Sequence, residues 1–217
     1  MESSKNAGGA VSIDPKPLPS PRNGLPAGLY GMVDAAPAEA LSALEDRARF
    51  LVDNGVGVVQ LRDKHGAESL IRMRTLAERC ARFVPLLVLN DHAELASELD
   101  PTGARIWSHV GQEDGPDPRG PFGRSTHTIA QVTSAGAARY IGFGPVFSTA
   151  TKNTGYGPRG VAGLEAAVKA SAVPVIAIGG ITLENIEAVR ATGAHGWAVI
   201  SGFWDHRHDP AALARLR

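Results

Sequence analysis

The feature that most constrains this chain is a repeated alternation between short apolar runs and amphipathic stretches. The runs are rich in β-branched residues, as in Val56–Leu61 and Val175–Ile178. Short continuous apolar runs are typical of parallel strands buried on both faces. The stretches between them carry apolar residues at three- and four-residue steps, as at Leu41, Leu44 and Ala48, which indicates helices. The chain is therefore predicted to alternate strand and helix.

Eight strands are predicted in this way, and all but one are followed by a plausible helix. The expected strands are Leu29–Val33, Val56–Leu61, Leu86–Leu89, Ile106–Val110, Phe122–Arg124, Tyr140–Phe143, Val175–Ile178 and Trp197–Ile200. The expected helices are Ala38–Asn54, Ala67–Phe83, Ala93–Leu99, Thr128–Ala135, Gly163–Ala170, Leu183–Thr192 and Asp209–Leu216. This order favours an α/β fold, the (β/α)8 TIM barrel. An open doubly wound sheet shares the alternation but usually has a glycine-rich turn after its first strand, where this chain has DAAP.

The connection between the fourth and fifth strands, here called the fourth connection, is the exception. It reads GQEDGPDPRGP, with three prolines and three glycines, so a helix of useful length is not expected after the fourth strand. The outer faces of the fourth and fifth strands would then lose part of their apolar cover. Neighbouring helices, the N-terminal tail or a second subunit could replace it, and we favour the tail or a homo-oligomer contact.

Length and composition fit one large domain over residues 28–217 of the 217-residue chain, of which 43% is hydrophobic. Residues 1–27 are rich in Ser, Gly and Pro, lack the apolar region of a signal peptide, and are expected to form a flexible tail. Cys80, the only cysteine, cannot form an intrachain disulfide, and no apolar run approaches the roughly 18 residues of a membrane span. A cytoplasmic protein without a membrane partner is expected.

Lys plus Arg and Asp plus Glu both number 22, so no overall basic field exists to attract nucleic acid. Any site for an anion must be local. The loop after Tyr140–Phe143 offers one, since Thr149, Thr151 and Lys152 follow a strand end together. Hydroxyls and backbone N–H groups bind phosphate oxygens, and lysine adds a point charge. The expected partner is a small phosphorylated molecule.

Other strand ends carry further polar residues. Alternation places Gln60, Arg62 and Lys64 on one side of the second strand, towards the barrel mouth, where two cations suit a diphosphate. Lys and Arg in such a loop can equally point into water. Asp91 and Asp114 follow the third and fourth strands and could share Mg²⁺, a hard cation that takes carboxylate and phosphate oxygens. The alternative is that Asp91 caps a helix and Asp114 decorates a turn.

The fifth, seventh and eighth strands complete this set. His127 follows the fifth strand and could be a general base, although a histidine beside a helix N-cap more often has a packing or hydrogen-bonding role. Gly179-Gly180 and Ser201-Gly202 follow the last two strands, where barrels commonly build a phosphate site. His92, His195 and the His206/His208 pair lack metal-ligand spacing with acidic partners, so no zinc site is expected.

Taken in order, seven motifs resemble those of thiamine-phosphate synthases over about residues 29–203. They are QLRDK at 60–64, ND at 90–91, HVGQED at 109–114, STH at 125–127, GPVFSTATK at 144–152, IGGI at 178–181 and AVIS at 198–201. The resemblance implies a (β/α)8 barrel that joins hydroxymethylpyrimidine diphosphate to thiazole phosphate and releases pyrophosphate with Mg²⁺. It is also a specific prediction, because the motifs follow one another in a fixed order.

The resemblance also implies a role for each matching residue. The pyrimidine diphosphate would be held by Gln60, Arg62, Lys64, Asn90, Ser125 and Lys152, and Mg²⁺ by Asp91 and Asp114. The thiazole phosphate would be bound by Thr149, Thr151, Gly180, Ile200 and Ser201. The catalytic charges would come from Arg62, Lys64 and Lys152, which stabilise the departing diphosphate. No protein nucleophile is needed for this reaction.

Two alternatives remain open at this point. A thiazole tautomerase on the same barrel would transfer a proton without diphosphate or metal, and a non-catalytic phosphate-binding barrel would bind without turnover. The chain departs from the family in its short fourth connection, its longer segment before the fourth strand and its N-terminal tail. The short connection bears most directly on the position of Ser125.

Overall fold

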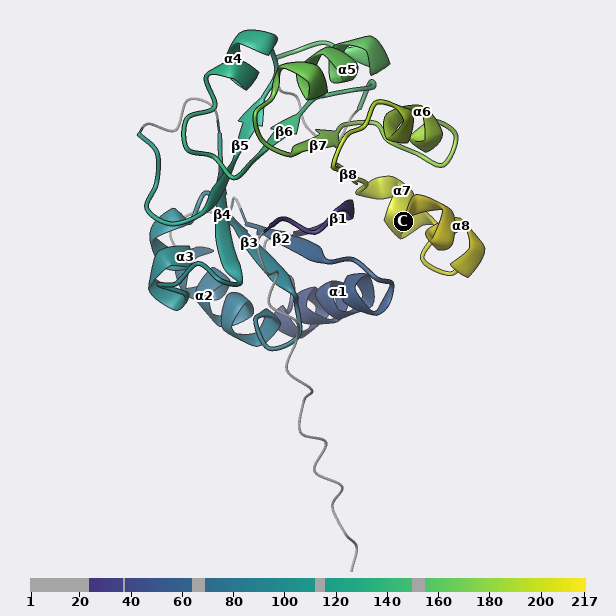
Figure 1. Cartoon of the computed structure of the whole chain (residues 1–217). Coiled ribbons are helices and arrows are strands. Elements are labelled where there is room, and N and C mark those ends of the chain that lie inside the picture. Colours follow the sequence, from purple (N-terminus) through teal and green to yellow (C-terminus); the bar gives the residue numbers. More distant parts are fainter. Residues whose placement is uncertain (1–23, 37, 64–68, 112–115, 150–154) are drawn as a thin grey trace, which may run out of the picture.

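The computed structural model describes residues 24–36, 38–63, 69–111, 116–149 and 155–217. Eight parallel strands pair in sequence order and close into a barrel, with helices around the outside (Figure 1). The strands are β1 (Gly28–Asp34), β2 (Val58–Arg62), β3 (Leu86–Asn90), β4 (Ile106–Val110), β5 (Phe122–Thr126), β6 (Tyr140–Phe143), β7 (Val175–Ile178) and β8 (Gly196–Ala198). The predicted (β/α)8 barrel is confirmed.

The helices follow the strands as expected, with one addition. They are α1 (Leu41–Asp53), α2 (Ser69–Cys80), α3 (Ala93–Leu99), α4 (Ile129–Thr133), α5 (Gly160–Ala170), α6 (Ile186–Ala191), α7 (Ser201–Asp205) and α8 (Pro210–Leu216). The predicted N-cap Thr128 is confirmed, since its hydroxyl accepts from the Gln131 N–H in a capping box. The short helix α7 was not predicted, and β8 ends at Ala198 rather than at Ile200.

Side chains divide the core into two layers because successive residues of a strand point to opposite sides. The larger layer lies between strands and helices, where Leu44 and Leu51 of α1 are 0% and 1% exposed. Burying a leucine side chain contributes roughly 1.5–3 kcal/mol. The smaller layer fills the barrel itself and includes Tyr30, Trp107 and Tyr140. Its polar neighbours define the site described below.

The floor of the barrel is closed by a residue expected to lie in the tail. Leu25 is 6% exposed and packs into the same cluster as Tyr30 and Trp107. Its carbonyl oxygen lies 2.7 Å from His195 Nε2. The barrel domain therefore begins by Leu25, slightly before the predicted boundary, while residues 1–23 lie outside the described residues.

The fourth connection has the predicted form. No helix occurs in its described residues, 111 and 116–121. The buried Arg124 points outward from β5, and its guanidinium donates to the Asp117 carboxylate at 2.6 Å. Phe122 and Val110 are 1% and 8% exposed in the single chain, so no second subunit is required to cover them.

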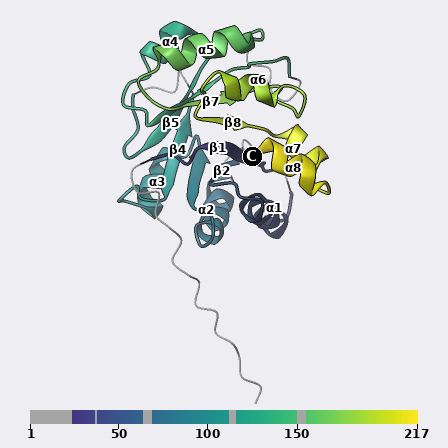
Figure 2. The same ribbon diagram turned by 45° about the vertical axis from the view of Figure 1, so that its right-hand side comes forward.

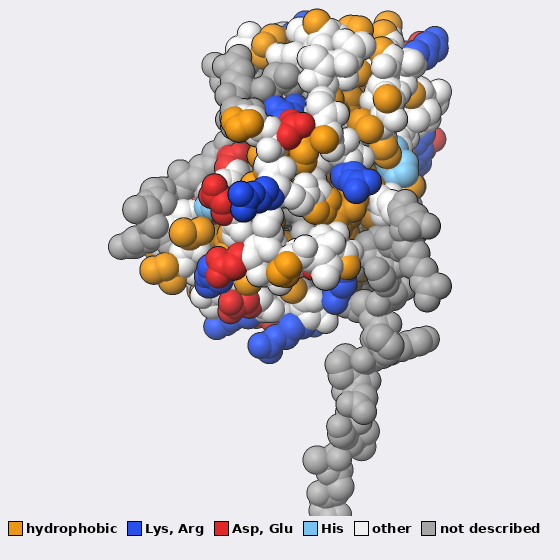
Figure 3. All heavy atoms as spheres, turned by 60° about the vertical axis from the view of Figure 1, so that its left-hand side comes forward, with side chains coloured by type: hydrophobic (Ala, Val, Ile, Leu, Met, Phe, Trp, Pro, Cys, Tyr) orange, Lys and Arg blue, Asp and Glu red, His pale blue; other side chains and the backbone are white. Residues whose placement is uncertain are grey.

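The helices α4 to α6 lie along one side of the barrel and α1 to α3 along the other (Figures 1 and 2). On the face shown in Figure 3, basic and acidic side chains of the described residues are interspersed, without a broad field of one sign. This arrangement agrees with the balanced composition. Among the described helices, none is both long and apolar enough to cross a membrane.

Candidate active site

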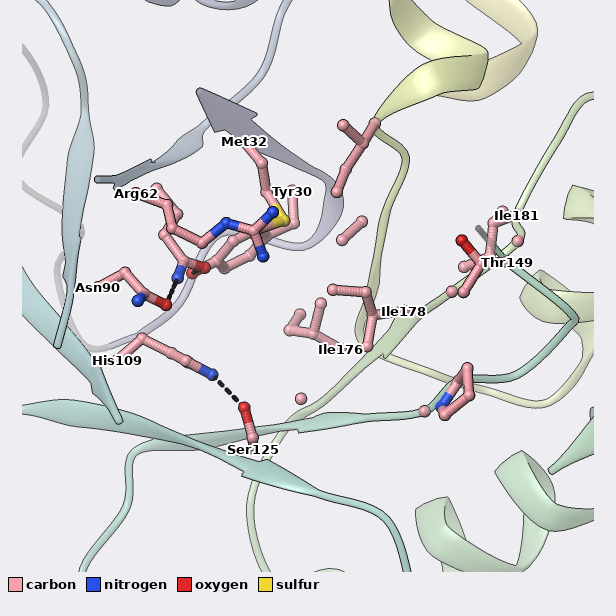
Figure 4. A pocket seen from close by; sticks show the side chains of 18 of the residues that line it. Tyr30, Met32, Arg62, Asn90, His109, Ser125, Thr149, Ile176, Ile178 and Ile181 are labelled. Carbon is pink, nitrogen blue, oxygen red and sulfur yellow. Dashed lines mark hydrogen bonds between the residues drawn. The ribbon is translucent and has the colours of Figure 1, made fainter. Parts of the chain in front are cut away.

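A pocket opens at the carboxyl ends of the strands, where TIM barrels place their active sites. Its volume is about 130 Å³. This is on the scale of the ~150 Å³ cavity that binds benzene, and because the pocket is open at its mouth, a ring fits inside while other groups extend outward. Figure 4 shows polar side chains from β2 to β5 on one side and, on the other, isoleucines of β7 and of the segment that follows it.

Eight of the predicted site residues line this pocket. They are Gln60, Arg62, Asn90, Ser125, Thr149, Gly180, Ile200 and Ser201. The structure therefore brings these eight residues together in one pocket, Ser125 among them despite the short connection before β5. Lys64, Asp114, Thr151 and Lys152 lie outside the described residues.

Arg62 is held by the carboxylate of Asp34, which is not among the predicted site residues. Its Nη2 donates to Asp34 Oδ2 at 2.7 Å, and its Nε donates to the other oxygen of the same carboxylate. A two-point bond of this kind fixes both the position and the plane of the guanidinium. Asp34 ends β1 and Arg62 ends β2, and the two residues are register partners. The guanidinium of Arg62 is therefore held in a fixed orientation at the mouth of the barrel.

The floor of the pocket is a row of buried polar groups. Tyr30 donates to Gln60 Oε1 at 3.0 Å, and Gln60 Nε2 donates to Asn90 Oδ1 at 2.7 Å. On the other side of Tyr30, its hydroxyl lies 2.7 Å from that of Tyr140. Burial raises the pKa of both tyrosines, that of Tyr30 well above its ordinary value. Both hydroxyls therefore stay protonated and remain available for hydrogen bonding.

The row continues to Ser125 through His109. His109 Nδ1 lies 3.0 Å from the Tyr140 hydroxyl, and its Nε2 lies 2.9 Å from Ser125 Oγ. Gly123 makes space for the Tyr140 ring, because a Cβ there would lie only 2.0 Å from the ring carbon Cζ. Tyr30, His109 and Tyr140 were not predicted as site residues. Their inward positions on alternate residues of β1, β4 and β6 are the signal that could have identified them.

Asp91 lies at the rim, exposed, next to this polar row. Its carboxylate accepts from Asn90 Nδ2 at 2.5 Å. It does not cap α3, whose N-cap is His92. The φ angle of Asp91 is +61°, an uncommon value outside glycine that occurs often at functional sites.

A single carboxylate on a strand end suits a Mg²⁺ ion that completes its shell with water and substrate phosphate. The described residues contain no cluster of three or more His, Cys, Asp or Glu side chains suited to a metal. The second predicted ligand, Asp114, lies outside the described residues. Asp91 could therefore supply one carboxylate ligand to a Mg²⁺ ion.

His127 also lines the pocket, and its contacts fit a packing and hydrogen-bonding role. Its Nδ1 lies 2.5 Å from the Gly144 carbonyl oxygen, and its ring stacks on Tyr156 at 4.4 Å between centroids. This matches the packing and hydrogen-bonding alternative. The stack joins the end of β5 to the segment that precedes α5.

The opposite side of the pocket is made of aliphatic side chains and glycine loops. Ile176, Ile178 and Ile200 line it, together with Gly179 and Gly180 after β7. Gly180 has a φ of +64°, and a Cβ there would lie 2.4 Å from the Ser148 carbonyl oxygen. Only glycine satisfies both conditions, so the β7 loop can pack against the loop that follows β6.

Comparison with known proteins identifies the family to which this site belongs. The sequence profile described as thiamine monophosphate synthase matches residues 29–203. The chain belongs to the thiamine monophosphate synthase family.

Individual relatives of this family support the assignment. The chain is 37% identical to a thiamine-phosphate synthase of Salinibacter ruber, covering 78% of each protein. It is 35% identical to one from a Synechococcus species over 85% of this chain but 54% of that longer protein. A solved thiamine phosphate pyrophosphorylase of Pyrococcus furiosus superposes with a TM-score of 0.69 at 26% identity, over 88% of this chain and 95% of that one.

Proposed function

We propose that this chain is a transferase that joins hydroxymethylpyrimidine diphosphate to thiazole phosphate and releases pyrophosphate. The observation that carries the proposal is one pocket that combines space for a ring, an oriented arginine and the glycine loop after β7. Membership of the thiamine monophosphate synthase family supports the same reaction.

The polar side of the pocket is suited to the pyrimidine diphosphate. Gln60, Asn90 and Ser125 offer amide and hydroxyl groups at the depth of the ring. Arg62 lies at the mouth, where its charge meets the diphosphate, and we assign Lys64 and Lys152 to the same group on the basis of their motifs. These cations stabilise the charge that develops on the leaving group.

The glycine-rich side is suited to the thiazole phosphate. Gly180, Ile200 and Ser201 follow the last two strands, and Thr149 follows β6 on the same side. Backbone N–H groups of such loops bind phosphate oxygens in many barrels. We assign Thr151 here as well, from its place in the TATK motif.

In the proposed reaction the carbon–oxygen bond to the diphosphate breaks, and the bonding electron pair leaves with pyrophosphate. The electron-rich pyrimidine carries the positive charge on its methylene carbon, and the thiazole nitrogen donates its lone pair to form the new carbon–nitrogen bond. Mg²⁺, held by Asp91 and Asp114, would neutralise diphosphate charge when bound. The protein residues orient both ligands and stabilise the leaving anion.

A direct assay tests the proposal. Purified protein, both substrates and Mg²⁺ should yield pyrophosphate and thiamine phosphate in equal amounts. A thiazole tautomerase would release no pyrophosphate, and a non-catalytic barrel would bind thiamine phosphate without turnover. Either result would overturn the proposed activity.

We also propose a cytoplasmic location, supported by the single free cysteine Cys80, which is buried. A homo-oligomer remains a prediction, and sedimentation of the full chain would test it.

A further inference from the structure

The polar floor of the pocket forms one unbroken row of hydrogen-bonded side chains. The row runs, in order, through Asp91, Asn90, Gln60, Tyr30, Tyr140, His109 and Ser125. Every link is between 2.5 and 3.0 Å. It connects the carboxylate proposed for magnesium with the hydroxyl proposed for the pyrimidine ring.

The direction of the first half of the row follows from Asp91. A carboxylate only accepts hydrogen bonds, so Asn90 must turn its NH₂ group towards Asp91. The Asn90 carbonyl oxygen then faces Gln60, which must present its own NH₂ group. This leaves the Gln60 carbonyl oxygen facing Tyr30, so the Tyr30 hydroxyl is the donor to Gln60.

The direction of the second half follows because each hydroxyl has one hydrogen. Tyr30 has used its hydrogen, so Tyr140 must donate to Tyr30. Tyr140 then has none left for His109, and His109 Nδ1 must carry the proton in their bond. A neutral imidazole protonated at Nδ1 has a bare Nε2, which accepts the hydrogen of Ser125.

We propose that Tyr30, Tyr140 and His109 are positioning residues that hold Ser125 as a hydrogen-bond acceptor towards the pocket. The Ser125 hydrogen points at His109, so its lone pairs are what a ligand meets. The site therefore selects a ring that offers an N–H donor at this place and discriminates against a carbonyl there. The identity of the ring as a pyrimidine rests on the proposed function, whereas the direction of the row does not.

Through this row, the choice between an N–H donor and a carbonyl at Ser125 depends on the hydroxyl of Tyr30. In Tyr30→Phe, Tyr140 loses its acceptor and becomes free to donate to His109 Nδ1. The proton of His109 then moves to Nε2, which donates to Ser125, and the Ser125 hydrogen turns towards the pocket. Ser125 would change from acceptor to donor, although Tyr30 and Ser125 share no direct bond in the row.

Nitrogen-15 NMR of the histidine rings tests this directly on the full chain without ligand. The chain has seven histidines, and the spectrum of His109→Gln identifies the signals of His109. At neutral pH we expect a protonated Nδ1 and a bare Nε2 in the natural protein, and the reverse in Tyr30→Phe. A protonated Nε2 in the natural protein, with either state of Nδ1, would overturn the proposal.

Kinetics provide the second test. The probes are a pyrimidine diphosphate with an exocyclic amine and its analogue with a carbonyl in place of the amine. Tyr30→Phe should raise the KM of the amine-bearing substrate about tenfold, with kcat within about twofold, and lower the preference for the amine at least about tenfold. An unchanged preference would contradict the positioning role.

Trp107→Phe is the matched control. Trp107 stacks on Tyr140 with 6.3 Å between centroids, but its indole N–H donates to Gly103 O and not to the row. This substitution should lower stability without moving the His109 proton or the amine preference. If Trp107→Phe changes both, packing rather than hydrogen-bond direction is responsible and the proposal fails. Absence of any turnover would overturn the proposed function and leave the NMR result to decide this inference.

Discussion

The two sides of the pocket recognise ligands by different means. The β1 to β5 side presents side chains, each fixed by a neighbour, as Arg62 is fixed by Asp34 and Ser125 by His109. The β7 to β8 side presents aliphatic groups and backbone, shaped by glycines such as Gly180. Figure 4 shows both sides facing one cavity. A side-chain substitution should therefore disturb the first side most, and a glycine substitution the second.

The strongest test of the polar side is Asp91→Asn. Loss of the anionic charge should lower Mg²⁺-dependent turnover by about 100-fold or more. Asparagine tolerates the φ of +61°, so the fold should be retained. Initial rates across a magnesium titration measure the effect, with Asp53→Asn at the exposed end of α1 as the control. Full activity of Asp91→Asn at limiting magnesium would exclude a metal role.

The next effect concerns the arginine at the mouth. Arg62→Lys keeps the charge but loses the two-point bond to Asp34, so kcat/KM for the pyrimidine diphosphate should fall ~10- to 100-fold. Steady-state kinetics measure this fall. Arg74→Lys is the control, because Arg74 pairs with Glu98 on the exposed surface at 2.6 Å. Equal kinetics in both variants would show that orientation by Asp34 is unimportant.

The glycine side is tested by Gly180→Ala. The new methyl group would meet the Ser148 carbonyl, so the KM for thiazole phosphate should rise ~10-fold and the free energy of unfolding should fall by about 1–3 kcal/mol. Gly193→Ala provides a control with a φ of +78° and no atom closer than 3.9 Å. It should lose stability without a change in KM. A raised KM for the pyrimidine diphosphate alone would contradict the division between the two sides.

The smallest expected effect is a pH dependence of the free energy of unfolding. It arises from Cys80, which belongs to neither side of the pocket. Burial raises the pKa of the Cys80 thiol to about 12 from an ordinary 9.0. Because the unfolded chain loses this proton first, the stability from Cys80 is complete below about pH 9 and is lost progressively as the pH rises towards 12. Alkylation of this only thiol should be slow in the natural protein and should report unfolding in every variant above. Rapid alkylation of the folded protein would contradict the burial.

Much of the fold was predictable because strand and helix signals are local. Val175–Ile178 is an apolar run closed by two glycines, and Thr128 carries an N-cap side chain. The helix α7 was missed because it spans five residues and its N-cap, Ile200, makes no side-chain capping bond. Leu25 was assigned to a tail because its burial depends on the closed barrel and not on its proline-rich neighbours.

The site was predictable where a residue type carries its own chemistry, as for Arg62 and Ser125. The polar row was not predictable in this way. Tyr30 and Tyr140 are 110 residues apart, and a buried tyrosine usually indicates packing. Their hydrogen bond exists only because barrel closure brings β1 and β6 to face one another across the interior.

The closure of the barrel floor by Leu25 affects how ligands enter the pocket. Leu25, Tyr30 and Trp107 pack together beneath the cavity and close its inner end. Ligands can therefore enter and leave only through the mouth of the pocket. Under the proposed function, one bound ligand narrows the path of the other, so an excess of thiazole phosphate should slow the entry of the pyrimidine diphosphate.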